Sequence, residues 1–367
     1  MNEALDSAVL FVHPPIEKRQ NTKNKPNDGS LRAPRTLRSA FSDMEKHDEL
    51  DTMIVNTTNA WYDAKHPVQT IDEIRMINSL AIEECPFCHR RHFHRDGFNK
   101  SGIQMYQCNG CKRKFNPLTD TIFDSHKIPI SQWIEFLIHP FQLQSIKVSA
   151  VDNANANSSG RYWAFKVFKA LKHYQDDLIV QGDFYTDETY IPVMPHDMIY
   201  KDGKKLRGLS RNVHCIFTAA DSENAVLIAN GFGKPSIKKA REALLPHVAK
   251  GSRMIDDGER SHSVLVTELN VERTIHPTKM TKGLPNEKNP MDPINEVHRT
   301  FKRFMKNHGG FKRSRIQDWC NLFSFIWNHH GDLPRMVRDM LQLLVSTHGV
   351  VRYRSVMAKN PDEHEAR

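Results

Sequence analysis

The sequence predicts a multidomain α/β (α+β) protein, in which a small cysteine-rich module and a helical segment precede a mixed sheet flanked by helices. Three observations support this prediction. Two Cys-x-x-Cys pairs lie between residues 85 and 111, apolar residues recur at helical spacing between 130 and 175, and β-forming residues alternate after residue 181. A length of 367 residues leaves room for two or three domains.

The composition is that of an ordinary globular protein with a positive charge. It is 39% hydrophobic and 26% charged, and the formal net charge of +9 at pH 7 favours a polyanionic partner. No apolar run approaches the roughly 18 residues of a membrane span, and no secretory signal opens the chain. We therefore expect a cytoplasmic protein without a membrane partner, whose six cysteines do not form disulfides. Four of them fall in two closely spaced pairs, and Cys215 and Cys320 are expected to be buried structural thiols.

The first 81 residues give the weakest signals. Residues 1–36 are polar, basic and proline-bearing, which predicts a flexible basic tail. Residues 37–81 contain apolar residues at helical spacing, among them Ile71, Ile74 and Ile77, and predict short helices of unassigned role.

Four cysteines predict a zinc ribbon over residues 82–120. Each pair is a tight knuckle, and nineteen residues separate the two pairs. Four thiolates at this spacing can stand at the corners of a tetrahedron, and a site closed by four protein ligands is structural rather than catalytic. The predicted Zn²⁺ ligands are Cys85, Cys88, Cys108 and Cys111.

Basic and aromatic residues mix between and after the knuckles, as Arg90, Arg95, Phe93 and Tyr106 illustrate. This mixture suits a ribbon that faces nucleic acid, whereas a module used for packing or protein contacts is the alternative. A histidine could also replace one thiolate, and three lie between the knuckles: His89, His92 and His94.

Residues 130–175 predict helices of helix-turn-helix type. Apolar residues recur at helical spacing over 130–143 and again from Tyr162 to Leu171, and residues 146–153 allow a short helix between them. The segment is compatible with DNA binding, although a plain helical linker has the same periodicity. The last helix carries the basic residues Arg161, Lys166, Lys169 and Lys172.

Residues 181–330 predict a ribonuclease-H-like core, because three antiparallel strands, a helix and a strand ending in an acid and a glycine follow one another. A helix at 331–348 and a tail at 349–367 complete the chain. We expect strands at 183–191, 212–220, 225–232, 253–258 and 272–276, helices at 236–248, 261–269 and from 292, and an irregular loop at 277–289.

Acids within these strands are the candidate site. Strand alternation places Asp187 on one face and Glu188 on the other. Asp257 ends a later strand, where Gly258 lets the backbone turn. A carboxylate in a buried strand is costly without a positive partner, so Asp187 and Asp257 are candidate metal ligands, although an edge strand with acids facing water would look similar.

The helix that starts at Asp292 and Pro293 carries a polar stripe. Asn295 and Lys302 are seven residues apart, which is about two turns, so they share one face. The stripe comprises Asn295, Arg299, Lys302 and Lys306.

Residues 85–327 resemble bacterial insertion-sequence transposases that have an N-terminal zinc ribbon and a DDE-type, ribonuclease-H-like catalytic domain. This resemblance implies that Asp187 and Asp257 are catalytic, that Asn295 is the third member, and that Lys302 contacts DNA. Arg299 and Lys306 of the same stripe are then further candidate DNA contacts. The motifs of the resemblance are the two knuckles, Asp187-Glu188-Thr189-Tyr190-Ile191, Asp257-Gly258-x-x-Ser261, and Ile294-Asn295-x-x-His298-x-x-Phe301-Lys302.

The resemblance implies a DNA transposase that binds terminal inverted repeats, cleaves 3′ ends and joins them to target DNA. It would act as a homo-oligomer on double-stranded DNA in the bacterial nucleoid, with one structural Zn²⁺. Asp187 and Asp257 would bind Mg²⁺, as two ions that Mn²⁺ can replace.

Asn295 departs from the Glu that many such enzymes carry. A neutral amide lowers the charge of the site, so the alternative is a catalytically inactive, transposase-derived DNA-binding protein. A zinc-dependent hydrolase is the weaker option, because no open, histidine-rich site is visible.

Overall fold

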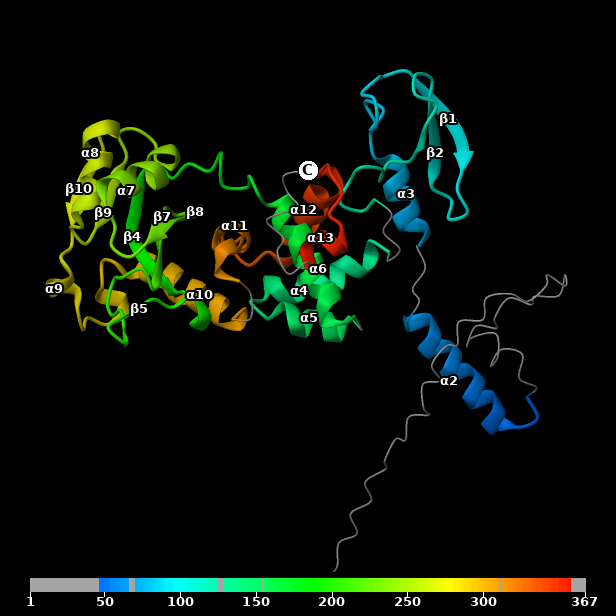
Figure 1. Cartoon of the computed structure of the whole chain (residues 1–367), viewed down its shortest axis with the longest axis horizontal. Coiled ribbons are helices and arrows are strands. Elements are labelled where there is room, and N and C mark those ends of the chain that lie inside the picture. The colour runs from blue at the N-terminus through cyan, green and yellow to red at the C-terminus, as the bar shows by residue number, and fades with distance from the viewer. Residues whose placement is uncertain (1–45, 66–69, 125–128, 154, 310–311, 358–367) are drawn as a thin grey trace, which may run out of the picture. The chain divides into compact units, whose positions relative to one another are not determined.

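The computed structural model describes residues 46–65, 70–124, 129–153, 155–309 and 312–357 (Figure 1). The chain divides into two units, residues 1–66 and 67–367. The first unit contributes helix α2 (Glu49–Lys65). The predicted tail at 1–36 lies outside the described residues. No helix within the described ranges is long and apolar enough to span a bilayer.

The second unit begins with a helix and a three-stranded antiparallel ribbon. Phe93, Tyr106 and Phe115 pack their rings against one another, with centroids 5.4–5.7 Å apart. Asn78 ties the helix to the ribbon, because its amide donates to Gly102 O at 3.0 Å and accepts from Gln104 N at 2.8 Å. The elements are α3 (Ile71–Ser79), β1 (Phe93–Phe98), β2 (Gln104–Cys108) and β3 (Lys114–Phe115), in sheet order β1-β2-β3.

Three helices follow, as the periodicity predicted. Trp133 stacks on Trp163 with ring centroids 4.4 Å apart. One of the four basic residues expected on the last helix does not face solvent: Lys166 is buried and donates to Ile122 O at 2.6 Å. The helices are α4 (Ser131–Phe141), α5 (Ile146–Asp152) and α6 (Asn157–Ala170).

A mixed five-stranded sheet has the order β10-β9-β4-β7-β8. Strands β4, β7 and β8 form an antiparallel meander, whereas β9 pairs parallel with both β4 and β10. This order and mixture of directions confirm the predicted ribonuclease-H-like sheet. The strands are β4 (Asp183–Pro192), β7 (Val213–Ala220), β8 (Ala225–Phe232), β9 (Arg253–Asp256) and β10 (Glu272–Ile275).

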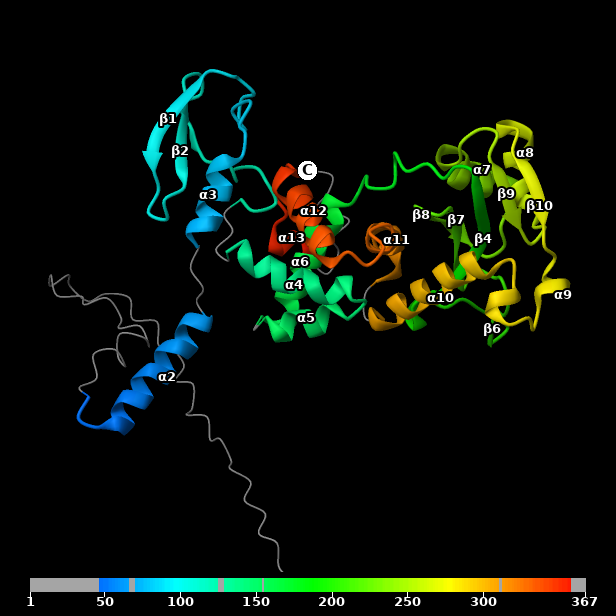
Figure 2. The same cartoon turned by 180° about the vertical axis from the view of Figure 1, so that it is seen from behind.

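Helices cover both faces of this sheet (Figure 2). On one face Phe184 and Phe217 pack with Leu244 and Leu265 of α7 and α8. On the other face α10 contacts β4 and β7, and α11 contacts β8. Helix α12 returns to pack on α4 and α6. The helices are α7 (Ile237–Leu244), α8 (Ser263–Leu269), α10 (Asp292–Asn307), α11 (Ile316–Trp327) and α12 (Leu333–Ser346).

Several details differ from the sequence predictions. The expected loop at 277–289 contains two short helices, and the expected tail at 349–367 begins with one. Helix α10 starts with Asp292 inside it rather than as its cap. A small hairpin before β7 was not predicted. These short elements are η1 (Pro195–Asp197), β5 (Tyr200–Lys201), β6 (Lys204–Lys205), η2 (Leu245–His247), η3 (Arg260–His262), α9 (Thr278–Thr281), η4 (Asn286–Lys288), η5 (Arg313–Arg315) and α13 (Tyr353–Met357).

Candidate active site and cysteine cluster

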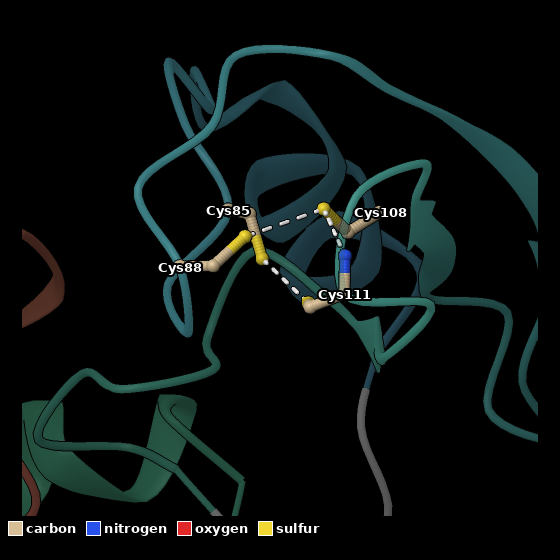
Figure 3. Close-up of side chains that lie close together, drawn as sticks. All are labelled: Cys85, Cys88, Cys108 and Cys111. Carbon is tan, nitrogen blue, oxygen red and sulfur yellow. Dashed lines mark hydrogen bonds between the residues drawn. The ribbon is translucent and has the colours of Figure 1, made fainter.

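The four predicted cysteines converge at one end of the ribbon (Figure 3). Their sulfur atoms all lie within 4.8 Å of one another, with Cys85 and Cys111 at 3.7 Å and Cys88 and Cys108 at 3.5 Å. A tetrahedral ion with metal–sulfur bonds of about 2.3 Å has sulfur–sulfur edges of about 3.8 Å. The four thiols therefore form a cluster that could hold a metal ion.

The knuckle geometry favours the thiolate form of Cys108. A hydrogen bond from the backbone N–H of Cys111, aided by one from Gly110, lowers the pKa of Cys108 to about 6 despite burial. The nearby histidines have other partners: His89 contacts Glu84 at 2.7 Å, and His94 contacts Asn109 at 2.8 Å. The cluster within the described residues thus consists of cysteines alone.

Asp187 lies on β4, and Asp257 directly follows the adjacent parallel strand β9. The ladder between these strands pairs Asp183 with Arg253 and Tyr185 with Ile255, two residues before each aspartate. Tyr185 packs against the core that includes α10, and strand alternation places Asp187 on the same face. The charge of Asp257 helps to raise the pKa of Asp187, so the two carboxylates lie within electrostatic reach of each other.

Within the part of the chain that the structure describes, the Asp187 carboxylate forms no ion pair with a lysine or arginine. Its side chain is 27% exposed, and its Oδ1 accepts a hydrogen bond from Glu188 N at 2.8 Å. Burial, together with the charges of Asp257 and Glu188, raises the pKa of Asp187 to about 7. A cation placed here would favour the ionised form.

Helix α10 brings a histidine to this carboxylate. His298 Nδ1 lies 3.7 Å from Asp187 Oδ2, and its Nε2 lies 3.0 Å from the hydroxyl of Thr218, which faces Asp187 across the β4–β7 ladder. Burial, with a contribution from Lys302, lowers the pKa of His298 to about 3, so the ring is neutral. Asn295 is one turn earlier on the same side of the helix and is half-buried.

The contact of His298 with Asp187 was not predicted from the sequence. The signal was present in the spacing, because residues three apart share a helix face and Asn295 was already a candidate.

Hydrogen bonds also fix the carboxylate of the second aspartate, Asp257. Asp257 Oδ1 accepts from Glu259 N at 3.1 Å, and Oδ2 accepts from the Thr278 hydroxyl at 3.3 Å. Gly258 has φ +94°, and a Cβ there would stand 3.0 Å from Ile275 Cγ2. Glycine is therefore required directly after the carboxylate.

Directly behind the two aspartates, on the opposite face, a buried network links their sequence neighbours. His262 joins Glu188 Oε1 at 3.0 Å to Asp256 Oδ2 at 2.8 Å. Arg273 adds contacts to Asp256 at 2.6 and 3.1 Å. Burial would lower the pKa of His262, but its bonds to Asp256 and Glu188 raise it to about 9. Sequence analysis missed this network, because its residues are joined only by folding.

The three predicted DNA contacts lie exposed on α10. Arg299 pairs with Asp292 of the same helix at 3.0 Å. Lys302 and Lys306 form no ion pair with a carboxylate in the described ranges, so their charges face solvent.

Comparison with known proteins gives only distant likenesses. No family model and no curated protein match the chain. One similar structure is a simian T-cell lymphotropic virus intasome in complex with PP2A regulatory subunit B56 gamma, at 11% identity and a TM-score of 0.23; the match covers 40% of this chain and half, 50%, of that one. Two others are a pre-cleavage Mos1 transpososome (10% identity) and the Mos1 strand transfer complex (9% identity), each with a TM-score of 0.21 over 57% of this chain and 77% of the other. These scores are too low to assign a family.

Proposed function

We propose that this protein is a DNA transposase of the insertion-sequence type, which cleaves DNA at the 3′ ends of its element and joins them to target DNA. One observation carries the proposal: Asp187 lies on β4, Asp257 directly follows the adjacent parallel strand β9, and the charge of Asp257 helps to raise the pKa of Asp187. Phosphodiester chemistry needs such a pair of carboxylates to gather divalent cations around a phosphate.

The donor set fits Mg²⁺. Two carboxylates and the amide oxygen of Asn295 are hard oxygen ligands. Burial and the charges of Asp257 and Glu188 raise the pKa of Asp187, and a bound cation would lower it. Asp187 and Asp257 would hold two Mg²⁺ ions, which Mn²⁺ could replace, with Asn295 as third ligand. When bound, the ions would lower the pKa of water and stabilise charge on the phosphate.

The surrounding residues would orient this pair and the DNA. Neutral His298, fixed by Thr218, limits the movement of the Asp187 carboxylate without neutralising it. Lys302 and Lys306 would bind phosphates, and Arg299 would do so after exchanging its Asp292 partner for DNA.

The cysteine cluster would hold one structural Zn²⁺, because four thiolates close the site. The ribbon and helices α4–α6 would then recognise terminal repeats. Pairing of two element ends calls for a homo-oligomer on double-stranded DNA, in the bacterial cytoplasm at the nucleoid.

Asn295 favours one other function, a DNA-binding protein without catalysis, because the site holds only two formal carboxylate charges. Strand cleavage that appears with Mg²⁺ and disappears with a chelator would exclude it.

The test of the proposal is cleavage of a plasmid that carries the DNA flanking the coding sequence. We expect Mg²⁺-dependent nicking by the wild type, and loss of at least about 10³-fold in D187N and D257N. D183N is the matched control, since Asp183 lies on the same strand but pairs with Arg253. Full activity of D187N or D257N would contradict the assignment.

A further inference from the structure

The connection between β4 and β7 is longer than the fold requires. Pro192 and Val213 face each other at the open end of the antiparallel ladder, where a turn of 2–5 residues would suffice. The chain instead makes an excursion over residues 193–212. Long connections in compact domains are commonly functional.

The excursion is anchored at its base by one buried side chain. Asn212 Oδ1 accepts from Ile199 N at 2.7 Å, and its Nδ2 donates to Ile199 O at 2.9 Å and to Leu206 O at 3.3 Å. The backbone carbonyl of Asn212 accepts from Val193 N at 3.0 Å. The hydrogen bonds of Asn212 therefore fix the direction in which the hairpin projects.

The hairpin itself exposes its side chains. Strands β5 and β6 are joined by Asp202 and Gly203, whose φ values of +49° and +72° are typical of a type I′ turn. Both strands are exposed, and Tyr200 is 59% accessible. A two-stranded ribbon this short is not stabilised by an apolar face of its own, so core packing does not explain it.

Charge indicates what this ribbon contacts. Five cations in the excursion are exposed, and none forms an ion pair with a carboxylate of the described residues. Unpaired lysines beside an exposed tyrosine suit a phosphate-bearing partner, and a two-stranded ribbon fits a groove of duplex DNA. The five cations are Lys201, Lys204, Lys205, Arg207 and Arg211.

The ribbon is close to the candidate site in the fold. Strand β4 carries Asp187 and ends at Pro192, and the hairpin stands beyond that end (Figures 1 and 2). A cavity of about 780 Å³ lies at its base, lined by Ile199, Arg211 and His214 among others. A duplex at Asp187 could thus extend over the hairpin.

We infer that the β5–β6 ribbon is a second duplex-DNA contact, separate from the α10 stripe, in which the lysines bind phosphates and Tyr200 lies in a groove. This inference rests on the proposed function, because it takes DNA as the substrate.

The experiment compares two charge-matched variants of the full-length protein. K201A/K204A/K205A removes the ribbon lysines, and K234A/K238A/K250A removes three exposed lysines elsewhere in the same domain. We expect the ribbon variant to bind duplex DNA about 10- to 100-fold more weakly at 150 mM salt, with the slope of log K against log salt shallower by about 2–3. The control should change by less than about 3-fold.

Two further variants separate the contribution of the lysine charges from the contributions of Tyr200 and of the position of the hairpin. Y200A should weaken binding with an unchanged salt slope, and N212A should weaken it although every lysine remains. Equal losses in both triple variants, or no loss in the ribbon variant, would overturn the inference. Metal-dependent cleavage by the wild type, measured on the same preparation, tests the proposed function separately. If the protein cleaves DNA but binds it equally well without the ribbon lysines, the proposed function stands and only the inference about the ribbon fails.

Discussion

Two adjacent pairs of acids meet opposite environments on the two faces of one sheet. On the α10 face, burial and like charges raise the pKa of Asp187 to about 7. On the α7 face, burial opposes ionisation of Asp256, but His262 and Arg273 hold its pKa below its usual range. Glu188 shares the same histidine. On the α7 face, His262 and Arg273 pair with the carboxylates. On the α10 face, no lysine or arginine of the described residues forms an ion pair with Asp187 or Asp257.

The difference separates the acids held by ion pairs from the two acids that we propose as metal ligands. A buried charge is tolerated when partners replace its water, and the Glu188–His262–Asp256–Arg273 network supplies those partners. It also ties β4 to the turn after β9, the two places from which Asp187 and Asp257 project. The ion pairs on the α7 face would thus help to fix the positions of Asp187 and Asp257.

Removing the central histidine should have the largest effect. H262A leaves Glu188 and Asp256 buried without their shared partner, so we expect a loss of about 3–5 kcal/mol in the free energy of unfolding. Urea denaturation of the full-length protein measures it. H196A, at an exposed histidine, is the control and should change little. An H262A protein as stable as the wild type would refute the role of the network.

The pH dependence of stability should follow the same histidine. The folded pKa of His262, about 9, exceeds the ordinary value of 6.5, so its contribution is complete below pH 6.5 and is lost as pH rises through 9. We expect the free energy of unfolding to fall by about 3 kcal/mol across this window. In H262Q the decline should flatten. A decline of the same size in H262Q would assign it to other groups.

Neutralising Glu188 and neutralising Asp187 should change the free energy of unfolding in opposite directions. E188Q weakens a buried ion pair and should destabilise the fold by about 1–3 kcal/mol. D187N removes an uncompensated charge and should stabilise the metal-free protein at pH 8 by a similar amount. Thermal melts of both variants at pH 8 and pH 5 check this, and the gain in D187N should shrink at pH 5, where Asp187 is protonated. Changes in stability of the same sign in E188Q and D187N would contradict the difference between the two faces.

The smallest effect is expected at an exposed pair. R299A breaks the Arg299–Asp292 contact on α10 and should change the free energy of unfolding by less than about 0.5 kcal/mol. The same variant should weaken duplex binding in low salt. A stability loss above 1 kcal/mol would mean that Arg299 is structural.

Local patterns were sufficient for much of the fold and part of the site. Cysteine spacing predicted the cluster, alternation predicted that Asp187 and Glu188 face apart, and element order predicted the sheet. The role of His262 could not be predicted, because its partners Asp256 and Glu188 lie on two strands that only folding brings next to it. Lys166 was misplaced because helical spacing does not reveal that Phe123, Trp133 and Tyr162 surround its ammonium group.

The hairpin at 199–206 escaped detection for a related reason. Its strands are two residues each and carry no apolar alternation, and the Asn212 side chain that anchors them gives no local signal.

Divalent-cation binding tests the central claim, that Asp187 and Asp257 form one metal site, most directly. Titration calorimetry with Mg²⁺, which thiolates bind poorly, separates this site from the cysteine cluster. We expect binding by the wild type and by D183N, and affinity at least about 10-fold lower in both D187N and D257N. Equal Mg²⁺ affinity in all four proteins would contradict the account.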